Sequence, residues 1–251
     1  MADATRKKCA VIAQDQPNCF GPEVLAAVSS RSDGTMLDRT KDDRHDSQVV
    51  ANRQKFCEAA GLSYATCVYQ IISYAPDTPF DTIKEVDAPN TEGVFADVLY
   101  TETPGVAMFL PVADCVGTVV YDPKRRALAL AHLGRHASIA KALSQTIEFF
   151  KQKGSDPADI RIWMGPSVAK DDYVLEYFDH QTDTDWQNYV DSRADGVHLD
   201  LAGYNKALAI KAGVPETNIC VSDVNTARDT NYFSHSQGDT NGRFAVVAQM
   251  R

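Results

Sequence analysis

Residues 104–138 constrain the fold of this chain more than any other stretch. The stretch contains a Cys between its first and second apolar runs and a His after its third, the runs being residues 106–112, 116–122 and 127–131. Short runs that are rich in Val and Leu and bounded by Pro or Gly are typical of buried strands. The stretch therefore predicts neighbouring strands that carry Cys115 and His132.

A thiol and an imidazole on neighbouring strands have two chemical uses and one structural one. They can form a nucleophile and its base, or two ligands of a metal ion. Free Cys is also among the most buried residue types, so a core Cys beside a hydrogen-bonded His is the default interpretation of an isolated pair. Other features of the sequence are needed to choose between a catalytic pair, a metal site and a buried structural pair.

Length and composition describe an ordinary globular protein. The chain has 251 residues, of which 44% are hydrophobic and 24% charged. No repeat or linker divides it, so we expect one domain over residues 1–251. A formal net charge of −9 argues against nucleic acid or an anionic membrane as an obligatory partner. No apolar run approaches the roughly 20 residues of a membrane helix.

The cysteines and the first residues of the chain predict a cellular compartment. Six cysteines are scattered without a CxxC pair, which indicates reduced thiols rather than a disulfide framework. The N-terminal segment has basic residues but no long apolar core after them, unlike a secretory signal. We therefore expect a cytoplasmic protein, and we assign no oligomeric state.

Apolar periodicity predicts helices and strands on both sides of the central stretch. Helical spacing covers residues 47–60, 137–153 and 199–212. Further strands are expected at residues 8–15, 24–29, 67–72, 160–164, 218–224 and 244–250. The charge run at residues 38–46 is expected to be a solvated loop. Several strand connections are too short for a crossover helix, so we predict an α+β fold with a layered mixed sheet flanked by helices.

Short motifs spread over nearly the whole chain occur in the order of one family's motifs. They are VSSR at 28–31, NR at 52–53, FADVLYT at 95–101, ADC at 113–115, HLG at 132–134, GPS at 165–167, and FS through GR at 233–243. They are similar, in order, to FSTR, ENR, ADALVT, ADC, HAGWRG, GPS and FSxRRDGxTGR. The chain thereby resembles the laccase-domain family, the YfiH-like proteins also described as polyphenol oxidases and purine nucleoside phosphorylases.

The resemblance implies an active site and a substrate class. Family members have a layered α+β fold and a zinc centre held by His, Cys and His. They phosphorolyse or deaminate purine nucleosides, with arginines that grip anionic groups. Carried over to this chain, the resemblance makes Cys115 and His132 the second and third zinc ligands. It makes three arginines candidates to bind an anion such as phosphate: Arg31, Arg53 and Arg243.

The chain departs from the family pattern at chemically important positions. The family's first ligand lies in a QVHG motif, and here the corresponding run places Ile72 at the histidine position. After HLG the family has WRG, whereas this chain has Arg135, His136 and Ala137. Near the C-terminus, Ser236-Gln237 replaces a double arginine. The zinc ligand set is therefore incomplete, and fewer cations hold phosphate.

Three hypotheses follow for the function. The first is an enzyme of purine nucleosides, a phosphorylase-type transferase or an adenosine deaminase-type hydrolase. In it, zinc has a substitute third ligand from His136, His235 or Cys67, and Asp114 transfers protons. The second is a metal-free Cys-His hydrolase that resembles deamidases of the cytotoxic necrotizing factor type. The third is an inactive binding protein that keeps the fold.

We favour the first hypothesis, with a purine nucleoside as the small-molecule substrate. Its catalytic residues are Cys115, His132 and Asp114, and two of these, Cys115 and His132, are also the metal ligands. Oxidation of phenols is the family activity we favour least. The sequence lacks the histidine clusters that several copper ions require.

Overall fold

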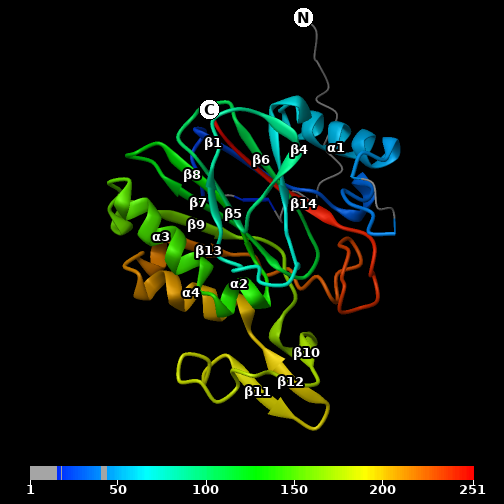
Figure 1. Ribbon diagram of the computed structural model, residues 1–251, viewed down its shortest axis with the longest axis vertical. Coiled ribbons are helices and arrows are strands. Elements are labelled where there is room, and N and C mark those ends of the chain that lie inside the picture. The colour runs from blue at the N-terminus through cyan, green and yellow to red at the C-terminus, as the bar shows by residue number, and fades with distance from the viewer. Residues whose placement is uncertain (1–15, 18, 41–43) are drawn as a thin grey trace, which may run out of the picture.

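Two mixed β-sheets that pack face to face form the centre of the computed structural model (Figure 1). The structure describes residues 16–17, 19–40 and 44–251. The first sheet has the order β1 (Val24–Val28), β14 (Phe244–Met250), β6 (Ala107–Val112), β2 (Cys67–Ile71) and β4 (Asn90–Phe95). The second has the order β13 (Ile219–Val221), β9 (Arg161–Met164), β7 (Val116–Asp122), β8 (Ala127–Leu133), β5 (Val98–Thr101) and β3 (Ile83–Glu85).

The alternation of side chains along each strand builds separate apolar layers. In β6, Met108 and Leu110 face the second sheet, whereas Phe109 faces the opposite side of the first sheet. Because every residue of β6, β7 and β8 is buried, these three strands are sandwiched on both faces. They are the strands that carry the central Cys and His.

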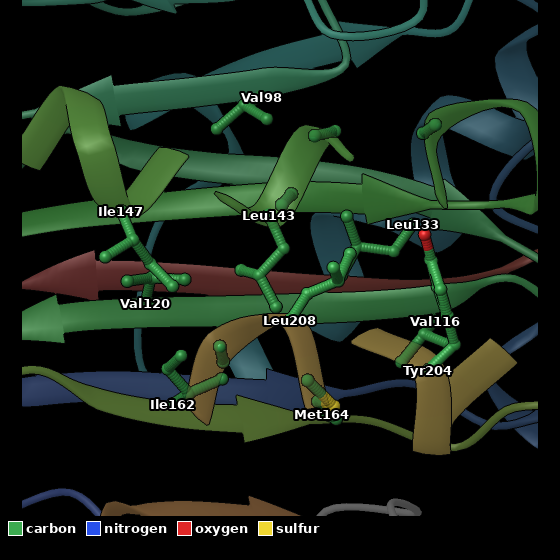
Figure 2. Packing of buried hydrophobic residues seen from close by; sticks show 14 of the residues in the cluster. Val98, Val116, Val120, Leu133, Leu143, Ile147, Ile162, Met164, Tyr204 and Leu208 are labelled. Atoms are coloured by element: carbon green, nitrogen blue, oxygen red, sulfur yellow. The ribbon is translucent and has the colours of Figure 1, made fainter. Parts of the chain in front are cut away.

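Helices cover the outer face of each sheet. Helix α1 (Ser47–Ala60) packs Phe56 and Cys57 on the first sheet. On the second sheet lie α2 (Arg135–Ile139), α3 (Ala142–Gln152) and α4 (Leu201–Lys211). Figure 2 shows Ile147 of α3 beside Val120 of β7, and Leu143 of α3 beside Leu208 of α4. The result is a stack of four layers, helix, sheet, sheet and helices.

The predicted helix at residues 47–60 is confirmed, and its ends have clear causes. The Asp46 side chain accepts hydrogen bonds from the backbone N–H groups of Gln48 and Val49. Gly61 ends the helix in the left-handed conformation, with φ 87°. The predicted strands 116–122 and 244–250 are confirmed at both ends.

The prediction of one helix over residues 137–153 is wrong. The chain forms two helices, α2 and α3, separated at Lys141, which has a φ of 58°. At this break, the side chain of Asn205 in α4 donates a buried hydrogen bond of 2.8 Å to Ser138 Oγ. A tertiary contact thus overrides helical periodicity here. The prediction that β8 ends before His132 is also wrong, since the strand extends to Leu133.

The predicted α+β class with layered mixed sheets is confirmed. Parallel pairs such as β2–β6 and antiparallel pairs such as β7–β8 occur in the two main sheets. A third, small sheet of β10 (Val174–Leu175), β12 (Gly196–Leu199) and β11 (Val190–Arg193) projects from the body (Figure 1). The predicted strand at 8–15 lies outside the described residues, and the single domain over 1–251 stays a prediction. In the described part, no helix is long and apolar enough to span a membrane.

Candidate functional site

A cavity of about 1160 Å³ brings together residues from distant parts of the sequence. Cys115, His132 and Asp114 line it, together with Arg243. Further walls come from residues 37–39, 69–72, 74, 135–136, 172–175 and 235–237. Its volume is large enough for a small organic ligand, since such pockets span roughly 300–1000 Å³.

Strand pairing brings the thiol and the imidazole to the same end of the second sheet. Cys115 immediately precedes β7, and His132 lies near the end of β8 opposite Gly117 of β7. A Cβ built on Gly134 would lie 2.9 Å from Cys115 Sγ and 3.0 Å from His132 Cε1. Both side chains therefore converge on the α-carbon of Gly134, where only a glycine leaves room for them.

Burial keeps both groups neutral at neutral pH. Burial lowers the pKa of His132 to about 4, with a further contribution from the positive charge of Arg243. Burial raises the pKa of Cys115 to about 12, and the neighbouring Asp114 carboxylate adds to the rise. Proton transfer from the thiol to the imidazole is strongly unfavourable with this order of pKa values. The pair as it stands is a neutral donor and a neutral base rather than a thiolate and an imidazolium.

The carboxylate of Asp114 is already held on both oxygens. Oδ1 accepts a hydrogen bond of 2.7 Å from the hydroxyl of Thr226, and Oδ2 accepts one of 2.7 Å from the backbone N–H of Ser236. The Asp114 backbone adopts the left-handed conformation, with φ 67°. The residue therefore ties two loops of the C-terminal half to the Cys115 junction.

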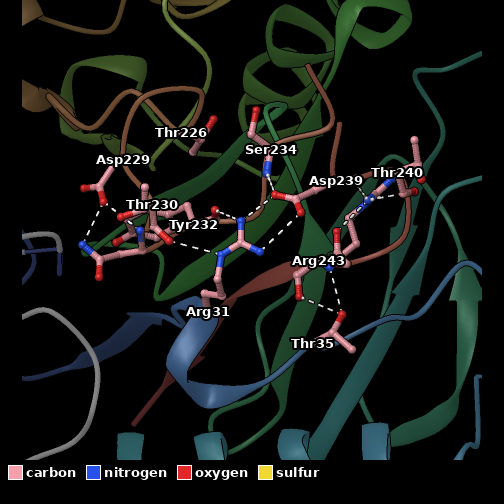
Figure 3. A network of polar contacts seen from close by, with 12 residues as sticks. Arg31, Thr35, Thr226, Asp229, Thr230, Tyr232, Ser234, Asp239, Thr240 and Arg243 are labelled. Carbon is pink, nitrogen blue, oxygen red and sulfur yellow. Dashed lines mark hydrogen bonds and ion pairs between the residues drawn. The ribbon is translucent and has the colours of Figure 1, made fainter. Parts of the chain in front are cut away.

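Of the three arginines singled out in the sequence, only Arg243 lines the cavity. Its Nη1 donates to the backbone carbonyl oxygens of Asp239, Thr240 and Gly242. Arg31 lies outside the cavity lining, where it pairs with Asp239 and donates to the Tyr232 carbonyl oxygen (Figure 3). Through these contacts Arg31 holds the loop of residues 232–239, which precedes Arg243.

Arg53 lies in the apolar layer beneath α1 and does not line the cavity. Its guanidinium donates to the carbonyl oxygens of Met36 at 2.8 Å and of Arg44 at 2.9 Å, and stacks on the Tyr69 ring at 4.3 Å. The charge run at residues 38–46, expected to be a solvated loop, contributes Asp38, Arg39 and Arg44 to the cavity wall. Arg53 thus positions the segment that carries these residues.

The donor set does not fit the zinc centre that the resemblance implies. Ile72 lines the same cavity at the position of the family's first histidine ligand. Among the residues that the structure describes, no three His, Cys, Asp or Glu side chains are placed to share a metal ion. His136 instead stacks on Phe80, with ring centroids 4.6 Å apart. Two donors, Cys115 and His132, are fewer than the three of a catalytic zinc site.

Aromatic side chains also line the cavity, although the sequence assigned them no role in the site. Tyr74 and Phe95 line the cavity with more than half of their surface exposed, and Tyr173 lines it as a partly buried phenol. Burial raises the pKa of Tyr173, so its phenol is protonated and can donate a hydrogen bond. Such rings commonly stack on planar ligands. A single Tyr in a sequence does not indicate whether it will do so.

A second cavity, of about 720 Å³, lies along β13. Its lining includes Trp163, Cys220 and Arg228 but no histidine. Cys115, His132 and Arg243 all belong to the larger cavity alone. The larger cavity is therefore the candidate active site.

Comparisons with known proteins agree with the motif order. The family model described as multi-copper polyphenol oxidoreductase laccase matches residues 28–251. A purine nucleoside phosphorylase of Deinococcus radiodurans is 28% identical over 241 residues, which cover 94% of this chain and 90% of that protein. Adenosine deaminase RL5 of an unknown prokaryotic organism is 31% identical over 150 residues, 57% of this chain and 56% of that protein.

Solved structures share the fold. YlmD from Geobacillus stearothermophilus aligns with a TM-score of 0.78 at 22% identity, covering 97% of this chain and 99% of that chain. The hypothetical protein YfiH of Bacillus licheniformis aligns with a TM-score of 0.76 at 24% identity, covering 91% of this chain and 93% of that chain. The layered architecture is thus that of the YfiH and YlmD structures.

Proposed function

Because the chain belongs to the multi-copper polyphenol oxidoreductase laccase family, we propose that it is an enzyme that cleaves purine nucleosides with phosphate. Its active site is the cavity that contains Cys115, His132 and Arg243. The relatives named purine nucleoside phosphorylase and adenosine deaminase support this substrate class. The observation that carries the proposal is the convergence of Cys115 and His132 on Gly134 at the floor of that cavity.

Phosphorolysis makes specific demands on a site. A phosphate oxygen forms a bond to C1′ of the ribose, and the purine leaves with the electrons of the glycosidic bond. The site must therefore hold an anion and stabilise negative charge that develops on the purine. Arg243 provides a cation, and the protonated Cys115 thiol and Tyr173 phenol provide hydrogen-bond donors.

We assign Asp114 and Gly134 supporting roles in the site. Asp114 holds the loops that carry Ser236 and Thr226, and its oxygens are both engaged. Gly134 leaves room for the two reacting side chains. Because the donor set does not fit a three-ligand zinc site, no step of the proposed mechanism passes through a metal.

The metal-free Cys-His hydrolase is less well supported. Such an enzyme needs a thiolate, and the pKa values of about 12 for Cys115 and about 4 for His132 oppose its formation. The inactive binding protein remains the second candidate. The replacement of the first ligand by Ile72 within the same cavity favours it.

A substrate panel tests the proposal. The protein is incubated with inosine, guanosine or adenosine, with and without phosphate, and the free base and sugar phosphate are quantified by chromatography. We expect phosphate-dependent release of base that falls at least about 100-fold in Cys115→Ala and His132→Gln. The matched controls are Cys220→Ala, beside the second cavity, and His180→Gln. No turnover with any nucleoside, alongside measurable nucleoside binding, would support the binding protein instead.

A further inference from the structure

Four arginines line the candidate active site, from three separate parts of the chain: Arg39, Arg44, Arg135 and Arg243. None of them pairs with a carboxylate among the residues that the structure describes. Arginines outside the cavity do form ion pairs. Arg31 pairs with Asp239, and Arg193 pairs with Asp171 and Asp191. A protein with a formal net charge of −9 thus gathers in one cavity four arginines that have no ion pair within its described residues.

Three carboxylates also line the cavity, and each has hydrogen-bond or ion-pair partners other than these arginines. Asp38 accepts hydrogen bonds from the backbone N–H and hydroxyl of Thr40. Asp172 accepts from Asn225 and pairs with Arg228 at 2.7 Å. Asp114 is held by the loops described above. Asp114 keeps its negative charge and thereby raises the pKa of Arg243. The four arginines outnumber the three carboxylates of the lining, so positive charge is left for a ligand.

Two of these arginines repel each other, and a third has an unused buried donor. Burial lowers the pKa of Arg243, and the positive charge of Arg39 lowers it further. Nη1 of Arg44 is buried without a hydrogen-bond partner in the described structure. Mutual repulsion and an unused buried donor are costs that a bound anion would remove.

We propose that the ligand of this cavity is a purine nucleotide, a nucleoside with its own phosphate group, rather than a neutral nucleoside. This inference rests on the proposed function and specifies its substrate class. The inorganic phosphate that phosphorolysis consumes is matched by one or two arginines, which leaves the other arginines for a phosphate group on the nucleoside itself. A phosphate ester adds about 1.5 to 2 negative charges and three acceptor oxygens. The exposed ring of Phe95 is available to stack on the base, and so is the exposed part of Tyr74, whose ring also contacts Phe80 and His136.

Isothermal titration calorimetry with three probes tests the inference: adenosine 5′-monophosphate, adenosine and inorganic phosphate. We expect the monophosphate to bind at least about 10-fold more tightly than adenosine in 50 mM NaCl. The ratio of the two affinities should fall at least about 5-fold in Arg39→Gln and in Arg135→Gln. It should also fall as NaCl is raised to 500 mM, since salt screens the cations. Arg193→Gln, on the small sheet, is the matched control and should keep the wild-type ratio.

The outcomes separate this inference from the proposed function. Equal affinities for adenosine and its monophosphate would overturn the nucleotide inference and leave the proposed function standing. A tighter monophosphate whose advantage survives both substitutions would overturn the assignment to these arginines. Binding of none of the three probes would overturn the proposed function as well. Thermal unfolding of each variant, monitored by circular dichroism, verifies that the protein titrated is folded.

Discussion

The hydroxyl of Thr226 donates a hydrogen bond of 2.7 Å to Oδ1 of Asp114, the residue before Cys115. The two residues are far apart in the sequence, and the contact links the β6–β7 junction to the segment between β13 and β14. The same carboxylate receives the backbone N–H of Ser236, which lines the cavity. Asp114 thus braces the wall of the site, and its predicted role in proton transfer stays a prediction.

Asp114→Asn should destabilise the fold and loosen the wall of the cavity. An amide keeps one acceptor for Thr226 but turns an N–H₂ group towards the N–H of Ser236. We expect the free energy of unfolding to fall by about 1–3 kcal/mol, the cost of losing a buried hydrogen bond to a charged group. Urea denaturation measures it.

Asp77→Asn is the matched control for this change, because Asp77 also has a positive φ, of 66°, but is exposed. The control should leave the free energy of unfolding within about 0.5 kcal/mol of the wild type. An equal loss in both variants would show that the Asp114 contacts add no stability.

Gly134→Ala should disable the site without straining the backbone. Gly134 has a φ of −82°, which alanine adopts readily, so the added methyl group acts only through its contacts with Cys115 and His132. We expect kcat/KM to fall at least about 10-fold, because small displacements of reacting groups are costly. Steady-state kinetics measures this loss.

Gly105→Ala is the control, because there the added methyl group strains the backbone but contacts no side chain. Gly105 has a φ of 84° and nothing within 4 Å of the added Cβ. It should lose about 1 kcal/mol of stability through backbone strain and keep its kcat/KM. A fully active Gly134→Ala would show that the side chains at Gly134 are not the reacting groups.

The buried neutral His132 should make stability fall in mild acid. Its pKa is about 4 in the folded state, below the ordinary value of 6.5. Between these values the unfolded chain binds a proton that the folded chain does not, so the free energy of unfolding decreases as pH falls from 6.5 to 4. The decrease is roughly 3 kcal/mol for a shift of this size.

Denaturation at a series of pH values, after dialysis against a chelator, checks this prediction. His132→Gln should flatten the dependence between pH 6.5 and 4, whereas His180→Gln, at a more exposed ion pair with Asp183, should leave it in place. The same slope in wild type and His132→Gln would contradict burial of a neutral imidazole.

Arg31 should affect the order of a loop more than global stability. Its guanidinium contacts Asp239 and the carbonyl oxygens of Thr230 and Tyr232, and it lies over the Phe233 ring at 4.3 Å. Arg31→Gln should increase amide hydrogen exchange within residues 229–243 and leave exchange in β7 unchanged. Unaltered exchange in that loop would show that other contacts hold it.

The sequence was most informative where local pattern and tertiary environment agree. The apolar runs of β7 and β14 and the capped helix α1 were predicted with their ends because their burial follows their periodicity. Helix 137–153 was mispredicted because the break at Lys141 depends on packing against α4. The mixed fold class followed from connection lengths, which do not depend on such contacts.

The candidate site was predictable only in part. Cys115 and His132 stood at strand ends and within recognisable motifs, and strand pairing brings them together. Arg53 belongs to one of the family's motifs, but its side chain is buried between α1 and the first sheet instead of lining the cavity. The order of motifs cannot tell a buried arginine from one that lines a cavity. Arg39 was hidden in a charge run, and its place at the cavity depends on how Arg53 holds that segment. Contacts between distant segments decide these positions.

A crystal structure of the protein soaked with inosine and phosphate tests the central claim most directly. The account predicts electron density for the nucleoside in the larger cavity, with the base near Tyr74 and an anion beside Arg243. Density for the nucleoside in the second cavity, against Trp163 and Arg228, with the cavity of Cys115 and His132 empty, would contradict it.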